Sequence, residues 1–228
     1  ELYGEAVSAR YKEYIKMAEA GKLRTVDKVP ALQQFKRILT SLQATSHPWL
    51  TWKDTINVRA LNNNTGTIHL SNLCTEITLP QDKNNIATCN LVSINLSAFL
   101  SEDKTWDWDR LKEAARAAVR QLDNLCDITQ TPIPEAMHSN QQTRAIGLGI
   151  MGLSDVLEKL GYCYESKEAY DLVDQLTEFI SYHAIDQSAD LAKELGSYPT
   201  FAGSGWSKGL LPIDTVDKLS KDRGVKVK

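Results

Sequence analysis

Helical and extended segments alternate along this chain, and this alternation limits its fold more than any other feature. Helical periodicity is clearest in residues 106–127, where one apolar stripe contains Leu111, Ala115, Ala118, Leu122 and Leu125. Further helices are predicted at 3–20, 30–44, 153–160, 166–195 and 214–222, and short extended runs at 67–71, 75–79, 87–97 and 144–150. No hairpin signal such as Asn-Gly joins neighbouring runs. Crossover connections in a helix-rich α/β fold are therefore favoured over an antiparallel sandwich.

The composition is that of an ordinary globular segment. The chain has 228 residues, is 42% hydrophobic and 24% charged, and carries a net charge of -3. This charge gives no reason to expect nucleic acid or a membrane surface as the partner. No apolar run approaches the roughly 18 residues that span a bilayer, and no export leader opens the chain. We therefore expect a cytoplasmic protein, with residues 1–228 forming one segment without an internal domain boundary.

Four cysteines, at positions 74, 89, 126 and 163, are too few and too scattered for a disulfide framework. No Cys-x-x-Cys pair or Cys/His cluster has metal-ligand spacing, so no metal site is predicted. The thiols are expected to be free or to cycle between oxidation states. Cys126 continues an apolar helix stripe and Cys163 follows a helix cap, so structural roles are favoured for both.

The stretch Ser71–Glu76 carries the densest chemistry. In an extended backbone, Asn72, Cys74 and Glu76 would point to one side, spread over roughly 13 Å. An amide, a thiol and a carboxylate would then lie within reach of one small substrate. A plainer interpretation is a strand in which Cys74 is a small core residue, because free cysteine is often buried. Spacing alone leaves both interpretations open.

Four ordered motifs resemble the large, catalytic subunits of class I ribonucleotide reductases. They are SNLCTEITLP at 71–80, ATCNLVSINL at 87–96, RAIGLGIMGL at 144–153 and KGLLPIDT at 208–215. His47-Pro48-Trp49, followed by Lys53-Asp54, also fits. The similarity covers residues 30–216, and the ordered set is more specific than any single motif. Val92 departs from the pattern, which usually has glycine there; the departure concerns local packing more than chemistry.

The resemblance implies a fold and a set of roles. The fold would be part of a ten-stranded α/β barrel, with the radical-bearing cysteine on a loop inside it. Cys74 would become a transient thiyl radical that takes the 3′ hydrogen of the ribose. Glu76 would act as the base on the 3′ hydroxyl, and Asn72 would orient the ribose hydroxyls. Ser71, Asn72 and Glu76 would contact the substrate, a ribonucleoside diphosphate that is reduced for deoxyribonucleotide synthesis.

The same resemblance implies several partners. Cys89 would be half of the redox-active dithiol, with its disulfide partner outside this chain. The radical would come from a separate metal-containing subunit, and a thioredoxin- or glutaredoxin-type protein would restore the thiols. No cofactor is expected to bind this chain itself. We expect the chain to be one piece of the catalytic subunit, inactive until it is assembled with the missing segments.

Two other functions compete with this one. Gly147, Gly149 and Gly152 spell G-x-G-x-x-G, which suggests a dinucleotide-binding dehydrogenase. Such a unit needs a second strand ending in an acidic residue, but Asp171 falls within a predicted long helix. The glycines are therefore interpreted as close-packing positions. The other alternative, a non-catalytic binding or regulatory module, is disfavoured because Asn72, Cys74, Glu76 and Cys89 are all present.

Overall fold

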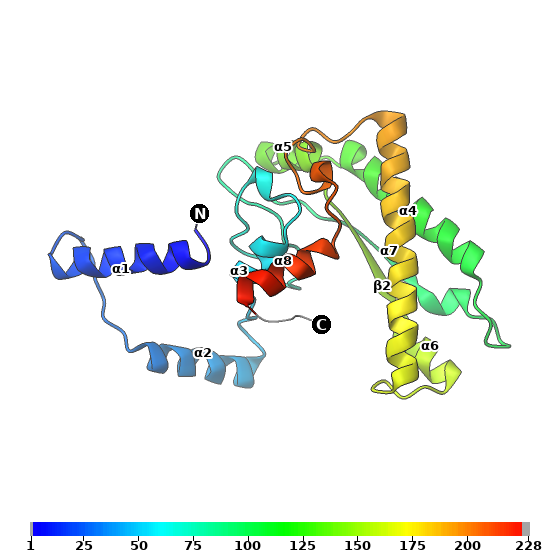
Figure 1. Cartoon of the computed structure of the whole chain (residues 1–228), viewed down its shortest axis with the longest axis horizontal. Helices are drawn as coiled ribbons and strands as arrows, with labels where there is room; N and C mark the ends of the chain where they lie inside the picture. The colour runs from blue at the N-terminus through cyan, green and yellow to red at the C-terminus, as the bar shows by residue number, and fades with distance from the viewer. Residues whose placement is uncertain (1, 225–228) are drawn as a thin grey trace. The chain divides into compact units, whose positions relative to one another are not determined.

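The structure of the chain is a computed structural model that describes residues 2–224. These residues fall into two compact units. The first comprises the chain up to Asp82 together with the stretch from Ala202, and the second runs from Lys83 to Phe201. Helices predominate in the described part, alongside one two-stranded sheet (Figure 1). This content fits the predicted helix-rich α/β class, whereas the ten-stranded barrel stays a prediction.

The first unit is built from helices and loops. Its elements are α1 (Glu5–Glu19), α2 (Ala31–Thr45), α3 (Lys53–Arg59), the 3₁₀ turns η1 (Asn63–Thr65) and η3 (Trp206–Lys208), and α8 (Asp214–Arg223). The predicted helices at 3–20, 30–44 and 214–222 are confirmed to within two residues. Helices α3 and α8 pack against each other, and Arg59 Nε donates a hydrogen bond to Thr215 Oγ1 at 3.1 Å.

The second unit contains the sheet. Strand β1 (Asn90–Asn95) pairs in parallel with β2 (Ile146–Met151), in a register that matches Asn90 with Ile146 and Asn95 with Met151. The connection between them runs through η2 (Leu96–Phe99), α4 (Trp108–Ile128) and α5 (Pro134–Thr143). Helices α6 (Leu153–Leu160) and α7 (Lys167–Leu195) follow. The predicted parallel crossover is therefore confirmed for this strand pair.

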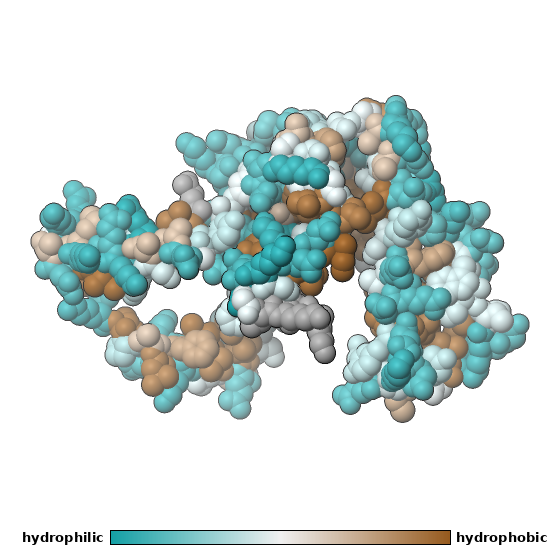
Figure 2. Space-filling model, viewed as in Figure 1, coloured by the Kyte–Doolittle hydropathy of each residue, from teal (hydrophilic) through white to brown (hydrophobic). Residues whose placement is uncertain are grey.

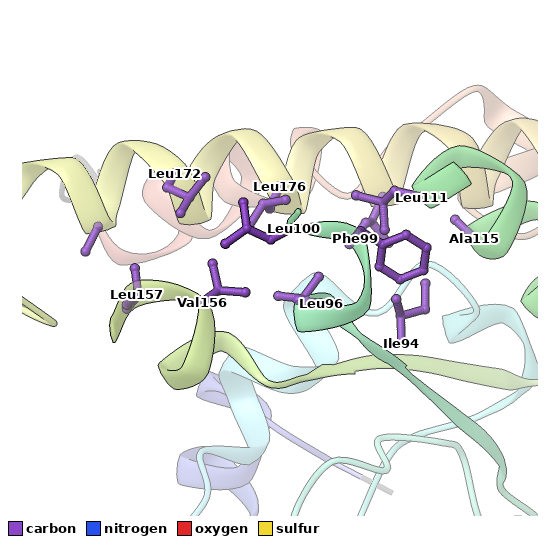
Figure 3. Packing of buried hydrophobic residues seen from close by; sticks show 12 residues of the cluster. Ile94, Leu96, Phe99, Leu100, Leu111, Ala115, Val156, Leu157, Leu172 and Leu176 are labelled. Carbon is purple, nitrogen blue, oxygen red and sulfur yellow. The ribbon is translucent and has the colours of Figure 1, made fainter. Parts of the chain in front are cut away.

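The core of the second unit lies between α4, α6, α7 and η2. Figure 3 shows Leu111 from α4, Leu176 from α7, Val156 from α6 and Leu96 from η2 as members of one cluster of buried side chains. Each of these four side chains is at most 1% exposed. Ion pairs of Arg116 and Arg120 with acidic residues of α7 reinforce the contact between α4 and α7 at its edge. Leu111 and Ala115, from the stripe predicted for residues 106–127, belong to this core.

Local signals explain where the long helices begin and end. Asp107 accepts a hydrogen bond from Arg110 N at 3.0 Å, and Ser166 accepts one from Ala169 N at 3.2 Å, which caps α4 and α7. Gly161 ends α6 in the left-handed conformation, as predicted. The same cap was predicted at Gly196, but its ψ of 162° lies outside that region.

The predicted secondary structure is wrong in four places. No strand forms at 67–71 or 75–79, both of which lie in loops within the described chain. Helices α3 and α5 were not predicted. For α5, Pro134 was treated only as a helix breaker, although proline is favoured in the first turn, where its missing N–H has no helical partner.

Candidate functional site

The segment that contains Cys74 folds as a tight turn. Asn72 O accepts a hydrogen bond from Thr75 N at 3.1 Å, and Thr75 takes a positive φ of 63°. Beyond the turn, Ser71 Oγ donates to Ile77 O at 2.7 Å, and Ile77 N donates to Asn72 Oδ1 at 3.1 Å. These local bonds give the Ile77 backbone the partners that a neighbouring strand would supply. The extended geometry predicted for 72–76 is therefore wrong.

The turn brings two of the predicted site residues much closer together than a strand would. Asn72 Nδ2 donates a hydrogen bond to Glu76 Oε1 at 2.7 Å, whereas the extended geometry spread Asn72 to Glu76 over roughly 13 Å. Cys74 lies between them in the turn, and all three residues are exposed. The core interpretation of Cys74 is thus wrong. The turn offers a carboxylate that can accept a proton, with an amide fixing one of its oxygens.

Cys89 belongs to the second unit and lies just before β1. Its thiol is exposed, while its neighbours are held from both sides. Thr88 Oγ1 donates to Ala136 O of α5 at 3.1 Å, and Asn90 is 5% exposed. A fixed backbone with an accessible sulfur is suited to thiol–disulfide exchange, which requires access to the sulfur.

A buried polar network anchors the residue after Cys89. Asn90 Nδ2 donates to Asn140 Oδ1 at 2.8 Å and lies 3.5 Å from the sulfur of Cys126. Asn140 Nδ2 donates in turn to Cys126 O at 3.1 Å. Asn140 is 3% exposed, so these bonds satisfy groups that are removed from water. Neither asparagine was singled out from the sequence, because a lone amide gives no periodic signal.

Arg144 opens the glycine-containing motif and ties it to α4. It takes a left-handed conformation and binds the carboxylates of Asp123 and Asp127 at 2.8 and 2.6 Å. The hydrogen bond from Arg144 holds the pKa of the Asp127 carboxyl below its usual value. Arg144, the first residue of the motif, is thus held in place beside the Asn90 network.

The glycines of this motif serve close packing. A Cβ on Gly147 would lie 2.4 Å from Leu91 of the paired strand, and one on Gly152 would lie 2.5 Å from Asn95 Oδ1. The chain after them forms α6 and α7, so residues 167–195 supply no second strand for a dinucleotide-binding unit. Asp171 instead pairs with Lys167 on the surface of α7. The close-packing interpretation is confirmed.

The remaining thiols differ in environment. Cys126 is 0% exposed, and burial raises the pKa of its thiol, so it is a packed and unreactive group as predicted. Cys163 is exposed in the loop after α6. Within residues 2–224, no three His, Cys, Asp or Glu side chains gather in a way that could hold a metal ion. The same residues contain no helix that is both long and apolar enough to cross a membrane.

Comparison with known proteins identifies the family to which the chain belongs. The family model described as the ribonucleotide reductase barrel domain matches residues 1–226. The chain therefore belongs to the ribonucleotide reductase barrel-domain family.

Individual relatives narrow the comparison. The chain is 43% identical over 224 residues to the ribonucleoside-diphosphate reductase subunit alpha of Chlamydia pneumoniae, covering 98% of this chain and 21% of that protein. It is 36% identical over 222 residues to the ribonucleoside-diphosphate reductase large subunit of Danio rerio, covering 97% and 27%. For the large subunit of Variola virus the identity is 40% over 188 residues, covering 82% and 24%. The chain thus spans about a quarter of the length of these relatives.

Proposed function

We propose that this chain supplies the thiyl-radical cysteine and one reducing cysteine of a ribonucleoside-diphosphate reductase. The observation that carries the proposal is the turn at 71–77. In a member of this family, it presents an exposed thiol between an amide and a carboxylate that are hydrogen-bonded at 2.7 Å.

The first half of the reaction takes place at this turn. The Cys74 thiyl radical removes the 3′ hydrogen of the ribose and becomes a thiol. Glu76 accepts the proton of the 3′ hydroxyl, and the 2′ hydroxyl leaves as water after it takes one of the two protons that the dithiol of Cys89 and its partner supplies. Asn72, already bonded to Glu76, holds the ribose hydroxyls, and Ser71 completes the contacts with the substrate. Fixing these groups in advance lowers the entropic cost of bringing them to the substrate.

The second half consumes two thiols. Cys89 and a cysteine outside this chain deliver two electrons and two protons and end as a disulfide. The hydrogen taken at the start then returns to the 3′ carbon from Cys74, which regenerates the radical. An external thioredoxin- or glutaredoxin-type protein reduces the disulfide for the next turnover. The held backbone and exposed sulfur of Cys89 support this role.

The proposal requires partners. Other segments of the catalytic subunit complete the barrel and supply the second redox cysteine. A separate metal-containing subunit supplies the radical, and this chain itself holds no cofactor. The substrate is a ribonucleoside diphosphate, and we expect the assembled enzyme to act in the cytoplasm.

The experiment is a reductase assay of the assembled enzyme with single thiol replacements. Cys74→Ser should abolish deoxynucleotide formation, because the O–H bond of serine is too strong for a relayed radical to break. Cys163→Ser, which replaces another exposed cysteine, is the matched control and should keep the wild-type rate. Deoxynucleotide formation by Cys74→Ser at a rate near that of the control would refute the proposal.

A further inference from the structure

The side chain of a buried asparagine on α3 binds the backbone just before the turn that contains Cys74. Asn57 is 1% exposed, and its side chain binds both backbone groups of Ile68. Ile68 N donates to Asn57 Oδ1 at 2.9 Å, and Asn57 Nδ2 donates to Ile68 O at 2.8 Å. The same nitrogen also donates to Lys53 O at 2.9 Å, within α3. One carboxamide therefore satisfies the N–H and the C=O of a single residue, as a neighbouring strand would.

The two hydrogen bonds between Asn57 and Ile68 replace the bonds that a neighbouring strand would make just before the turn. Residues 67–71 were predicted as a strand, yet they form none, and Ile68 is 3% exposed. Buried backbone groups need partners, and here helix α3 provides them. Lys53, one helical turn before Asn57, contacts His69 through an Nζ to Nδ1 distance of 3.1 Å. The helix thus holds two consecutive residues of the incoming chain.

Further hydrogen bonds fix the backbone between Ile68 and the turn. Gln81 Nε2 donates to Leu70 O at 3.2 Å, and the bonds from Ser71 and Asn72 to Ile77 close the turn itself. Helix α3 is in turn bonded to α8 through Arg59 and Thr215. A displacement at Ile68 would therefore reach Asn72 and Cys74, because only His69, Leu70 and Ser71 lie between.

We infer that Asn57 is a positioning residue for the reaction, fixing the Cys74 turn through the backbone of Ile68. The inference rests on the proposed function, in which Cys74, Glu76 and Asn72 must meet one ribose. Asn57 itself touches neither thiol nor carboxylate. Its effect should therefore appear in the chemical step more than in substrate binding, since small misplacements of reacting groups cost about 10²-fold in rate.

Two variants of the full-length protein, assembled with its radical-generating subunit, test this inference. Asn57→Asp keeps an acceptor for Ile68 N but loses the donor to Ile68 O, and Asn57→Leu loses both bonds at similar size. Hydrogen–deuterium exchange of residues 68–77 should accelerate about tenfold or more, because an unsatisfied buried group costs about 1.4 kcal/mol or more. Exchange in α7 should not change, which would show that the variants fold. The kcat should fall about 10–100-fold while KM stays within about threefold.

Ser204→Ala is the matched control. Ser204 is 0% exposed and accepts a hydrogen bond from Ser207 N at 3.1 Å, so Ser204→Ala also removes a buried hydrogen bond in the same unit. It should leave exchange at 68–77 and kcat unchanged. Unaltered exchange at 68–77 in both Asn57 variants, or a kcat loss no larger than that of Ser204→Ala, would overturn the inference. An assembled wild-type enzyme that makes no deoxynucleotide would instead refute the proposed function itself.

Discussion

At the scale of single residues, the geometry of the turn at 71–77 depends on how a few polar side chains share hydrogen bonds. Glu76 has one oxygen bonded to Asn72 at 2.7 Å, while the residue as a whole is exposed. A carboxylate held in this way keeps a second oxygen for a proton from the substrate. The role of base that we propose for Glu76 therefore requires its charge, whereas the hydrogen bond that holds Glu76 in the turn requires only an acceptor oxygen at the same position.

Replacing Glu76 by glutamine separates these two requirements. Glu76→Gln keeps the size and can still accept the bond from Asn72, but it cannot take up the 3′ hydroxyl proton. Because general acid–base groups typically contribute about 10²–10⁴-fold, we expect the rate of the assembled enzyme to fall by that amount. Single-turnover measurements, where chemistry limits the rate, provide the check. A loss below about threefold would remove Glu76 from the mechanism.

The candidate site residues could be chosen from the sequence, but the geometry of the segment that contains them could not be predicted. Asn72, Cys74 and Glu76 were singled out by residue type and motif, yet alternation predicted an extended strand. The turn results from side-chain bonds of Ser71 and Asn72 to Ile77, which periodicity does not represent. Asn57 was not identified from the sequence for the same reason, since the positioning role that we propose for it depends on a contact with Ile68 that only the folded chain creates.

At the scale of elements, helices α6 and α7 contain residues whose replacement should change the stability of the fold by a measurable amount. The glycine at the start of α6 combines a strained backbone with a close contact. Gly152 has a φ of 76°, and a Cβ there would meet Asn95 Oδ1 at 2.5 Å. Gly161, at the end of the same helix, has a φ of 80° but open space around the missing Cβ. Comparing them separates backbone strain from the contact.

Both glycine-to-alanine variants should lower the melting temperature. Gly161→Ala should cost about 1–2 kcal/mol from left-handed strain alone. Gly152→Ala should cost more, because it also displaces an Asn95 carboxamide that binds Ser97. Thermal unfolding of the two variants, side by side, measures the difference. Equal melting temperatures would mean that the contact with Asn95 contributes nothing.

The histidine of α7 should make stability depend on pH. His183 packs on Phe179, and its Nδ1 is buried without a hydrogen-bond partner in the described structure. Burial lowers the pKa of His183, and the charges of Lys112 and Arg116 lower it further, against the opposing effect of Asp186. The folded protein thus prefers the neutral ring more than the unfolded chain does. The stability it contributes is present above the unfolded pKa and is lost as pH falls through the folded value.

His183→Phe should remove this acid sensitivity. The variant keeps an aromatic ring on Phe179 but cannot be protonated. Melting temperatures measured between about pH 7.5 and pH 5 should fall less steeply for the variant than for the wild type, since the unperturbed value is near 6.5. Parallel curves over this range would show that His183 does not titrate with folding.

At the scale of the whole chain, many apolar side chains remain exposed. No residue of α1 or α2 in the described chain is buried, and Leu32, Phe35 and Leu39 of α2 are each more than 40% exposed. Figure 2 shows hydrophobic surface, in brown, over α2. Strands β1 and β2 pair only with each other, which leaves both outer edges of their sheet without a partner in the described residues. Such surfaces favour association. They fit a chain that spans about a quarter of its relatives' length and the larger assembly that we propose for it.

The two cysteines with proposed roles in the reaction lie in different units of the chain. Cys74 lies in the first unit and Cys89 in the second, each exposed in its own surroundings. The proposal assigns them successive steps on one nucleotide: Cys74 starts the reaction, and Cys89 completes it. Replacing each one should therefore stop turnover at a different point, with different products.

The most direct test follows both products of the assembled enzyme, deoxynucleotide and free base. Cys89→Ser should still activate the nucleotide at Cys74 but cannot reduce it, so the nucleotide should decompose and release base with little deoxynucleotide. Cys74→Ser should release neither product, because nothing removes the 3′ hydrogen. Full-rate deoxynucleotide formation by Cys89→Ser, or base release by Cys74→Ser equal to that of Cys89→Ser, would contradict the account.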